Sequence, residues 1–355
     1  MTLHPASFVF QGRIPRVVFG AGSLSHLERE LEVIKAQSVL LLCTPRQKKS
    51  IEEICKRLGS RCAGIFANAE MHVPIAVADE GSRVARETGA DCLVAIGGGS
   101  TIGLAKAIAL TSSLPILAIP TTYSGSEMTP IYGVTRDQEK KTGRSDVVLP
   151  KAVIYDPDLT MNLPVATSVT SGINAIAHAA EGLYARDANP VMSAIAEEGM
   201  RALVRGLPQL LVGGDAQEAR ADCLYGSWLC GVVLGNVGMG LHHKLCHTLG
   251  GTFNLPHAET HSVILPYVLA YNADAAPHAM ARIAQLFSAA NAAQAMFDFE
   301  CGLGAPQSLK KLGMPESGLD LCAKMVAKEA YPNPEKVEEK RVRELLEQAY
   351  SGIRP

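Results

Sequence analysis

The sequence predicts an α/β N-terminal domain with a Rossmann-like, mostly parallel sheet, followed by an all-α C-terminal domain. Short apolar runs alternate with amphipathic stretches of helical length as far as Tyr155, a pattern typical of βαβ units. A glycine-rich turn follows one of these runs at residues 97–99. Beyond the pair Asp156-Pro157, only helical periodicity is found.

The predicted strands are nearly continuous in apolar residues, as expected where helices cover both faces of a parallel sheet. They span residues 16–19, 38–43, 63–66, 91–96, 116–119 and 152–155. Amphipathic segments between them predict helices over residues 47–58, 75–88 and 101–110. The first domain is therefore placed at residues 1–158.

In the second domain, residues 159–355, prolines open or stop the periodic segments. The predicted helices span residues 165–184, 191–207, 216–241, 261–271, 275–292 and 335–350. Residues 225–241 carry no charge, but they contain five glycines and fall short of the ~20 strongly apolar residues of a membrane span. We therefore predict a buried helix there and no membrane partner.

Composition excludes several classes of partner and compartment. The 355 residues include 33 Lys+Arg and 35 Asp+Glu, so the excess positive charge that nucleic-acid binding requires is missing. The first residues lack a basic segment before an apolar core, so we expect no secretory signal. Nine cysteines without a CxxC pair favour a reducing cytoplasm over a disulfide framework.

Three glycines, Gly97, Gly98 and Gly99, directly follow a predicted strand, and Ser100 follows them as a helix cap. Glycines let the backbone approach a pyrophosphate closely, and a helix N-terminus offers unpaired N–H groups and a positive dipole end. The spacing is not the G-x-G-x-x-G fingerprint, and a plain tight turn is the alternative. We expect a phosphate-binding loop.

A hydroxyl-rich segment, which begins Thr121-Thr122-Tyr123-Ser124, follows the next predicted strand. Open α/β sheets bind their ligands at the carboxyl ends of neighbouring strands, so this segment is a candidate for phosphate and ribose contacts. The alternative is a Ser/Thr turn that only caps a helix.

Histidines are concentrated in the second domain. Five of the ten lie within 20 residues, at positions 242, 243, 247, 257 and 261. His243 and His247 are spaced i,i+4 and share a helix face, as do Asn174 and His178. A lone histidine is usually structural, whereas this cluster predicts a functional site shared by two helices.

Four segments together resemble the iron-containing alcohol dehydrogenase family. They are GGGS at 97–100, PTT at 120–122, Asp156-Pro157, and HxxxHxxGxxxxxPH from His243 to His257. The resemblance covers nearly the whole chain. It implies a dinucleotide-binding α/β domain, a helical catalytic domain, a site in the cleft between them, NADH or NADPH as cofactor, and a homodimer.

The family holds its metal with one Asp and three His. The matching positions are Asn174, His178, His243 and His257, and His247 matches a histidine near the nicotinamide. Because Asn replaces the carboxylate, the site is poorer for a hard cation, although three imidazoles can bind zinc. We expect no metal and regard these four positions as vestigial ligands.

The Asn at 174, the triplet His242-His243-Lys244, and the phrases QGRIPRVVFG and NLPHAETHSVILP are similar to one branch of the family. Members of that branch reduce the C=C bond of maleylacetate, a dicarboxylate, and often its chlorinated analogues, to 3-oxoadipates during degradation of aromatic compounds. They use NAD(P)H and need no metal. Three alternatives stay open: a metal-dependent alcohol or aldehyde dehydrogenase, a lyase of dehydroquinate-synthase type, and a non-enzymatic dinucleotide-binding regulator.

For the reductase reading, hydride addition to the C=C bond forms an enolate that needs preorganised donors. We assign His243 and His247 as catalytic, with His243 as the proton donor because a pKa near neutrality suits that role. Asn174 offers an N–H donor and does not repel a dianion. The other residues assigned to substrate are His178, Lys244, His257 and Tyr123.

Cofactor preference has one indication in the sequence. No acidic residue follows the second predicted strand, where an acid would bind the ribose 2′-OH and repel a 2′-phosphate. NADPH should therefore be accepted beside NADH, with Arg46 facing the 2′-phosphate. By resemblance, Lys141 matches a family lysine beside the cofactor.

Overall fold

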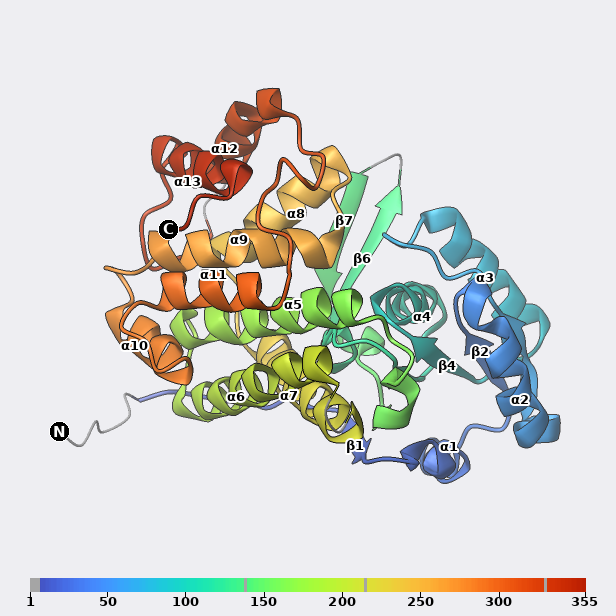
Figure 1. The fold of residues 1–355 in the computed structure, drawn as a ribbon. Coiled ribbons are helices and arrows are strands. Elements are labelled where there is room, and N and C mark those ends of the chain that lie inside the picture. Colours follow the sequence, from blue (N-terminus) through green and yellow to red (C-terminus); the bar gives the residue numbers. More distant parts are fainter. Residues whose placement is uncertain (1–6, 137–138, 214–215, 329–330) are drawn as a thin grey trace. The chain divides into compact units, whose positions relative to one another are not determined.

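The structure is a computed structural model that describes residues 7–136, 139–213, 216–328 and 331–355. By their internal contacts these residues form two compact units. One unit is Arg13–Leu163, and the other is Pro164–Pro355 together with residues 7–12. The contacts therefore divide the chain after Leu163, five residues beyond the predicted boundary. In Figure 1 the first unit is drawn in blue to green and the second, apart from its N-terminal residues, in green to red.

The first unit is built on a six-stranded sheet in the order β1-β8-β5-β4-β2-β3, and every pair in it is parallel, as predicted. Its strands are β1 (Arg16–Phe19), β2 (Val39–Leu42), β3 (Cys62–Phe66), β4 (Cys92–Gly97), β5 (Ile116–Pro120) and β8 (Ala152–Tyr155). Its helices are α1 (Leu27–Ile34), α2 (Lys48–Leu58), α3 (Ile75–Glu87) and α4 (Gly99–Ser112).

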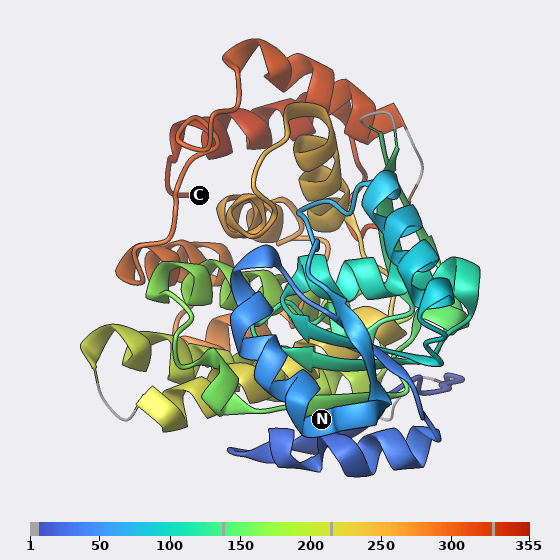
Figure 2. The same ribbon diagram turned by 90° about the vertical axis from the view of Figure 1, so that its right-hand side faces the viewer.

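Helices cover both faces of this sheet. α1 and α2 pack with Val39 and Leu41 in one buried cluster, whereas α3 and α4 pack with Leu40 and Leu42 in another. Successive side chains of a strand point to opposite faces, so one apolar run supplies both clusters. The four helices can be followed in blue and teal around the strands in Figure 2.

An antiparallel hairpin of β6 (Ile131–Arg136) and β7 (Glu139–Arg144) was not predicted. β7 reads EKKTGR and has no apolar run, so its pairing leaves no periodic signal. Short 3-10 helices complete the unit at Ser23–His26, Pro45–Gln47, Gly59–Arg61, Ser126–Met128, Asp146–Val148 and Pro157–Thr160.

The second unit is helical, without a strand among its described residues. Its helices are α5 (Val165–Tyr184), α6 (Pro190–Val212), α7 (Ala216–Asn236), α8 (Leu241–Phe253), α9 (His257–Tyr271), α10 (Pro277–Leu286), α11 (Ala292–Gly302), α12 (Leu319–Lys328) and α13 (Glu339–Ser351), with a 3-10 turn at Glu316–Gly318. None of the described helices is by itself long and apolar enough to span a membrane; α7 and α8 together are, but they meet at a bend of 96°.

Two segments predicted as single helices are divided in the structure. The segment 216–241 is not one helix, because α7 ends at Asn236 and α8 begins at Leu241. The segment 275–292 is also divided, because Ser288 adopts a φ of 52° after α10. The first break matters for the site, since it places the beginning of α8 against α5.

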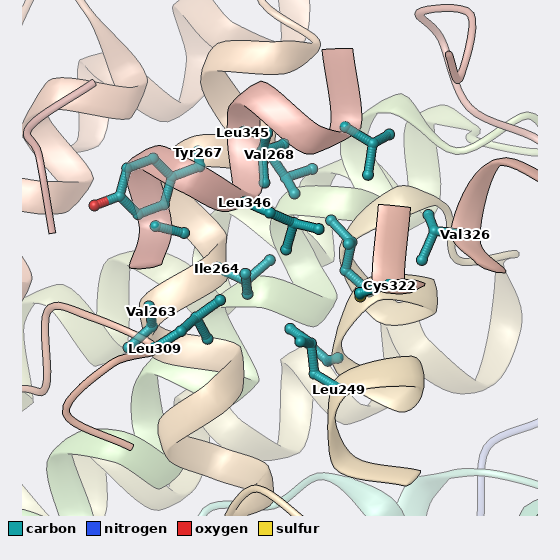
Figure 3. Packing of buried hydrophobic residues seen from close by; sticks show 14 of the residues in the cluster. Leu249, Val263, Ile264, Tyr267, Val268, Leu309, Cys322, Val326, Leu345 and Leu346 are labelled. Carbon is teal, nitrogen blue, oxygen red and sulfur yellow. The ribbon is translucent and has the colours of Figure 1, made fainter. Parts of the chain in front are cut away.

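α5 is buried along residues 168–183. Asn174, His178 and Glu181 lie at i, i+4 and i+7 on it and therefore share one face, with exposed fractions of 3%, 3% and 1%. Behind α8 and α9, a core of side chains from α8, α9, α12 and α13 fixes these helices (Figure 3). It includes Leu249, Ile264, Val326 and Leu346.

The cysteines form no disulfide framework among the described residues, but one pair was not predicted, since Cys55 on α2 and Cys62 on β3 are bonded to each other. Six of the seven other cysteines are buried, as expected for small core side chains, and Cys301 is exposed.

The buried side chain of Glu300 on α11 lowers the stability of the folded chain as pH rises. It is 1% exposed, its Oε1 has no hydrogen-bond partner among the described residues, and burial raises its pKa well above the usual range. The folded chain thus holds this proton more tightly than the unfolded chain, so stability falls as pH rises above the unfolded pKa of about 4.3.

We expect Glu300→Gln to raise the free energy of unfolding by about 1–3 kcal/mol at about pH 8, and by little at about pH 4. Urea unfolding of both proteins at the two pH values measures the difference. A gain of equal size at both pH values would contradict the assignment.

Candidate active site

The glycine loop lies where β4 passes into α4, with Gly98 as the N-cap. The N–H of Thr121 donates to the Gly97 carbonyl at 3.1 Å, and a Cβ at Gly98 would lie 2.9 Å from Thr122 Cγ2. The two predicted segments therefore meet at neighbouring strand ends. The first N–H groups of α4 have no acceptor within the helix and can face a pyrophosphate.

Gln47 completes this edge and was missed. Its Oε1 accepts from Thr44 Oγ1 at 2.8 Å, its Nε2 donates to Thr121 Oγ1 at 3.5 Å, and a Cβ at Gly97 would lie 3.2 Å from Oε1. The signal available in the sequence was the capping box that starts at Thr44. Arg46 is exposed in the same turn.

A buried lysine fixes the hydroxyl-rich segment. Lys106 on α4 donates to the carbonyls of Ser126, Thr129 and Ile131 at 2.6–2.8 Å. Burial lowers the pKa of Lys106 to about 7, against the opposing effect of the nearby Glu127 carboxylate. These bonds hold the chain that leaves β5 close to the glycine loop.

Two predicted residues of this unit gain no support. Tyr123 is fully buried, and its contact with substrate stays a prediction. Lys141 lies exposed on β7, and its place beside the cofactor stays a prediction.

In the helical unit, α5, α8 and α9 bring six histidines together. Ring centroids lie 5.0 Å apart for His178–His243, 6.2 Å for His243–His247, 6.4 Å for His247–His257, 4.3 Å for His257–His261 and 4.9 Å for His242–His261. The expected convergence of imidazoles from different helices is confirmed. His247 is exposed, His257 is half-buried, and the other four are buried.

Four side chains form a continuous hydrogen-bonded chain. Asn174 Nδ2 lies 3.4 Å from His178 Nε2, and His178 Nδ1 lies 2.9 Å from His243 Nε2. His243 Nδ1 lies 2.6 Å from Glu181 Oε2. Asn174 Oδ1 is buried and has no partner among the described residues.

The reason for preferring His243 as proton donor is not met. Burial lowers the pKa of His243 well below its ordinary value, and the neighbouring His242 and His247 lower it further. His243 is 7% exposed. Lys244, the next residue on α8, is half-buried.

Sequence reasoning missed Glu181 as a member of the site, and it counted His242 and His261 in the histidine cluster without giving either a role. Glu181 is detectable as the third member of the i, i+4, i+7 face of α5, and His261 lies one turn after His257 on α9. Both ring nitrogens of His261 and the Nδ1 of His242 are buried without a partner among the described residues.

The family's iron does not fit the four matched positions as they lie. Both ring nitrogens of His178 and of His243 are engaged in the hydrogen-bonded chain, and Asn174 brings no charge. Among the described residues, only His242, His243 and His261 have ligand atoms spaced for one ion. These three histidines include no carboxylate, and both ring nitrogens of His243 already take part in the hydrogen-bonded chain. We therefore derive no step through a metal.

Two family profiles match most of the chain. The profile "Iron-containing alcohol dehydrogenase" matches residues 15–157, and "Fe-containing alcohol dehydrogenase family, C-terminal" matches residues 168–350. The chain is 57% identical to a maleylacetate reductase of Burkholderia cepacia over 98% of its own length and 99% of the relative's.

Two solved structures are also similar. The maleylacetate reductase of Rhizobium sp. strain MTP-10005 has a TM-score of 0.94 at 48% identity and covers 98% of this chain and 99% of its own. A putative alcohol dehydrogenase from Ralstonia eutropha JMP134 has a TM-score of 0.96 at 55% identity and covers 99% of each chain. The chain belongs to the iron-containing alcohol dehydrogenase family.

Proposed function

We propose that this chain reduces the C=C bond of maleylacetate, and of chlorinated analogues, with NADH or NADPH to give 3-oxoadipate or its analogues. The observation that carries the proposal is Asn174, which replaces a carboxylate and is hydrogen-bonded to a histidine of the cluster. A neutral amide there does not repel a dianionic substrate. The maleylacetate reductases among its relatives support the same reading.

In this reaction a hydride adds to the alkene carbon β to the ketone, and a proton adds to the α carbon. The bound dinucleotide supplies the hydride, and the residues placed to hold it are Gly97, Gly98, Gly99 and Ser100 with Thr121 and Thr122. The nicotinamide end and the histidine cluster must reach the same substrate molecule.

We assign the remaining catalytic and substrate-binding roles to the histidines according to how exposed each ring is. We assign proton delivery to His247, because its exposed ring can exchange protons with solvent. His243 remains catalytic as a buried group beside the developing enolate. His257 and Lys244, both only partly buried, are placed to contact substrate carboxylates, and Asn174 and His178 hold the buried end.

The proposal includes turnover without a metal, since three of the four matched positions, Asn174, His178 and His243, are linked to one another by hydrogen bonds. It also includes a homodimer in the cytoplasm as the working form. The metal-dependent alcohol or aldehyde dehydrogenase remains the competing function, because the spacing of His242, His243 and His261 allows an ion.

The test is identification of product and stoichiometry with maleylacetate. We expect equimolar loss of NADH and appearance of 3-oxoadipate. A dehydroquinate-synthase-type lyase would return its cofactor unchanged, and a regulator would show no turnover; either result would reject the proposal.

We expect similar kcat/KM with NADPH and NADH, because no acid follows β2 and Arg46 is exposed beside the glycine loop. Arg46→Glu should lower kcat/KM for NADPH selectively, by about tenfold, through repulsion of the 2′-phosphate. Steady-state assays with both cofactors measure this. An NADH preference of about a hundredfold in the unsubstituted chain would contradict the interpretation.

A further inference from the structure

Glu181 connects α5 to the beginning of α8. Its carboxylate accepts from the backbone N–H of Gly240 at 3.1 Å and from that of His242 at 2.8 Å. These groups have no acceptor within α8, so the buried carboxylate acts as the cap of that helix. The same carboxylate lies 2.6 Å from His243 Nδ1.

Glycine is needed at position 240 for this approach. A Cβ there would lie 3.1–3.2 Å from the Pro332 carbonyl, Asn333 Oδ1 and Glu181 Oε1. The break between α7 and α8 therefore brings the carboxylate close enough to reach both the helix end and the His243 ring.

The contacts of Glu181 give the hydrogen-bonded chain a direction. Because this carboxylate already accepts backbone N–H groups, His243 is assigned the proton on Nδ1, which leaves Nε2 as an acceptor. His178 must then donate from Nδ1 and accept at Nε2, where the Asn174 amide donates.

We propose that Glu181 is a positioning residue that fixes the place and the Nδ1–H tautomer of His243, within the proposed reductase function. Asn174 is its counterpart at the other end of the chain. An Asp at 174 would require a proton on His178 Nε2 and so the opposite direction, whereas the amide N–H donates.

The direct test is the ¹⁵N spectrum of the histidine rings in full-length protein labelled with ¹⁵N-histidine. We expect a pyrrole-type nitrogen at His243 Nδ1 and a pyridine-type nitrogen at Nε2. A protonated Nε2 with a bare Nδ1 would overturn the proposal without any variant.

Glu181→Gln keeps the shape of the side chain. Its carbonyl can still accept from the His242 N–H, which leaves an NH₂ group facing His243 Nδ1. We expect the tautomer of His243 to reverse and kcat to fall about a hundredfold, with KM for NADH unchanged. Glu181→Asp retains a carboxylate and should retain the wild-type tautomer and more of the activity.

Asn333→Ala is the matched control for helix capping. Asn333 Oδ1 accepts from the Leu241 N–H at 3.4 Å, at the same helix end, and we describe no bond from it to the His243 ring. We expect a lower Tm with unchanged tautomer and kcat. If Asn333→Ala and Glu181→Gln lose equal kcat for equal loss of Tm, a structural role suffices and the proposal is overturned.

Failure of the proposed function would be recognised separately. A tautomer that reverses in Glu181→Gln, in a chain whose wild type does not reduce maleylacetate, supports the positioning of His243 and rejects the substrate. An unchanged tautomer in Glu181→Gln rejects the positioning whatever the substrate is.

Discussion

Asn174→Asp is expected to raise KM for maleylacetate about a hundredfold while KM for NADH stays nearly unchanged. Asn174 is 3% exposed, and its Oδ1 has no donor among the described residues, so an introduced carboxylate is buried and is compensated only as far as His178 Nε2 turns into a donor. At an effective dielectric constant of about 20, two like charges about 5 Å apart repel by about 3 kcal/mol. That energy corresponds to about two orders of magnitude in affinity.

The measurement is steady-state kinetics in the presence of a chelator, so that a restored ion cannot mask the repulsion. Asn189→Asp is the control for an added buried charge, because Asn189 caps α6 through its Oδ1, where Asp serves equally well. KM values that rise equally in both variants, or in neither, would contradict the charge argument.

Gly97→Ala is expected to raise KM for both NADH and NADPH about tenfold or more and to lower Tm. The added Cβ would overlap the Thr101 hydroxyl, lie 2.9 Å from Thr101 Cβ and lie 3.2 Å from Gln47 Oε1. Thr101 is fully buried in α4, so the loop has to move. Overpacking of this kind typically costs about 1–3 kcal/mol.

Gly99→Ala provides the comparison two residues along the chain. A Cβ there would lie 3.8 Å from Ser124 Oγ, an ordinary contact, so we expect a smaller rise in KM. Kinetics with both cofactors and thermal unfolding of both variants measure the difference. Equal damage from the two substitutions would show that the loop is sensitive to any side chain rather than to the contact at Thr101.

The strands of the sheet could be predicted because each one is a nearly continuous apolar run in the sequence. Runs such as Val39–Leu42 and Cys92–Gly97 are apolar throughout, and burial on both faces is what such runs require. The β6–β7 hairpin could not, because its polar residues pair without forming an apolar pattern. The end of α7 was likewise hidden, since the apolar composition continues beyond Asn236 to Leu241.

The candidate site was predictable where it rests on spacing within one helix. Asn174 with His178, and His243 with His247, were found from their i,i+4 spacing. The place of Glu181 on the same face of α5 could be read from its spacing, but its contacts could not, because Gly240 and His243 follow about 60 residues later and only folding brings them near. The lowered pKa of His243 was also inaccessible, since it arises from burial of the ring in the folded chain.

The central claim is reduction of maleylacetate by a chain that needs no metal. The direct measurement is NADH oxidation with maleylacetate by protein treated with a chelator and dialysed, with its metal content determined by elemental analysis. We predict an undiminished rate and equimolar 3-oxoadipate. A rate that disappears with the metal and returns on addition of iron or zinc would contradict the account.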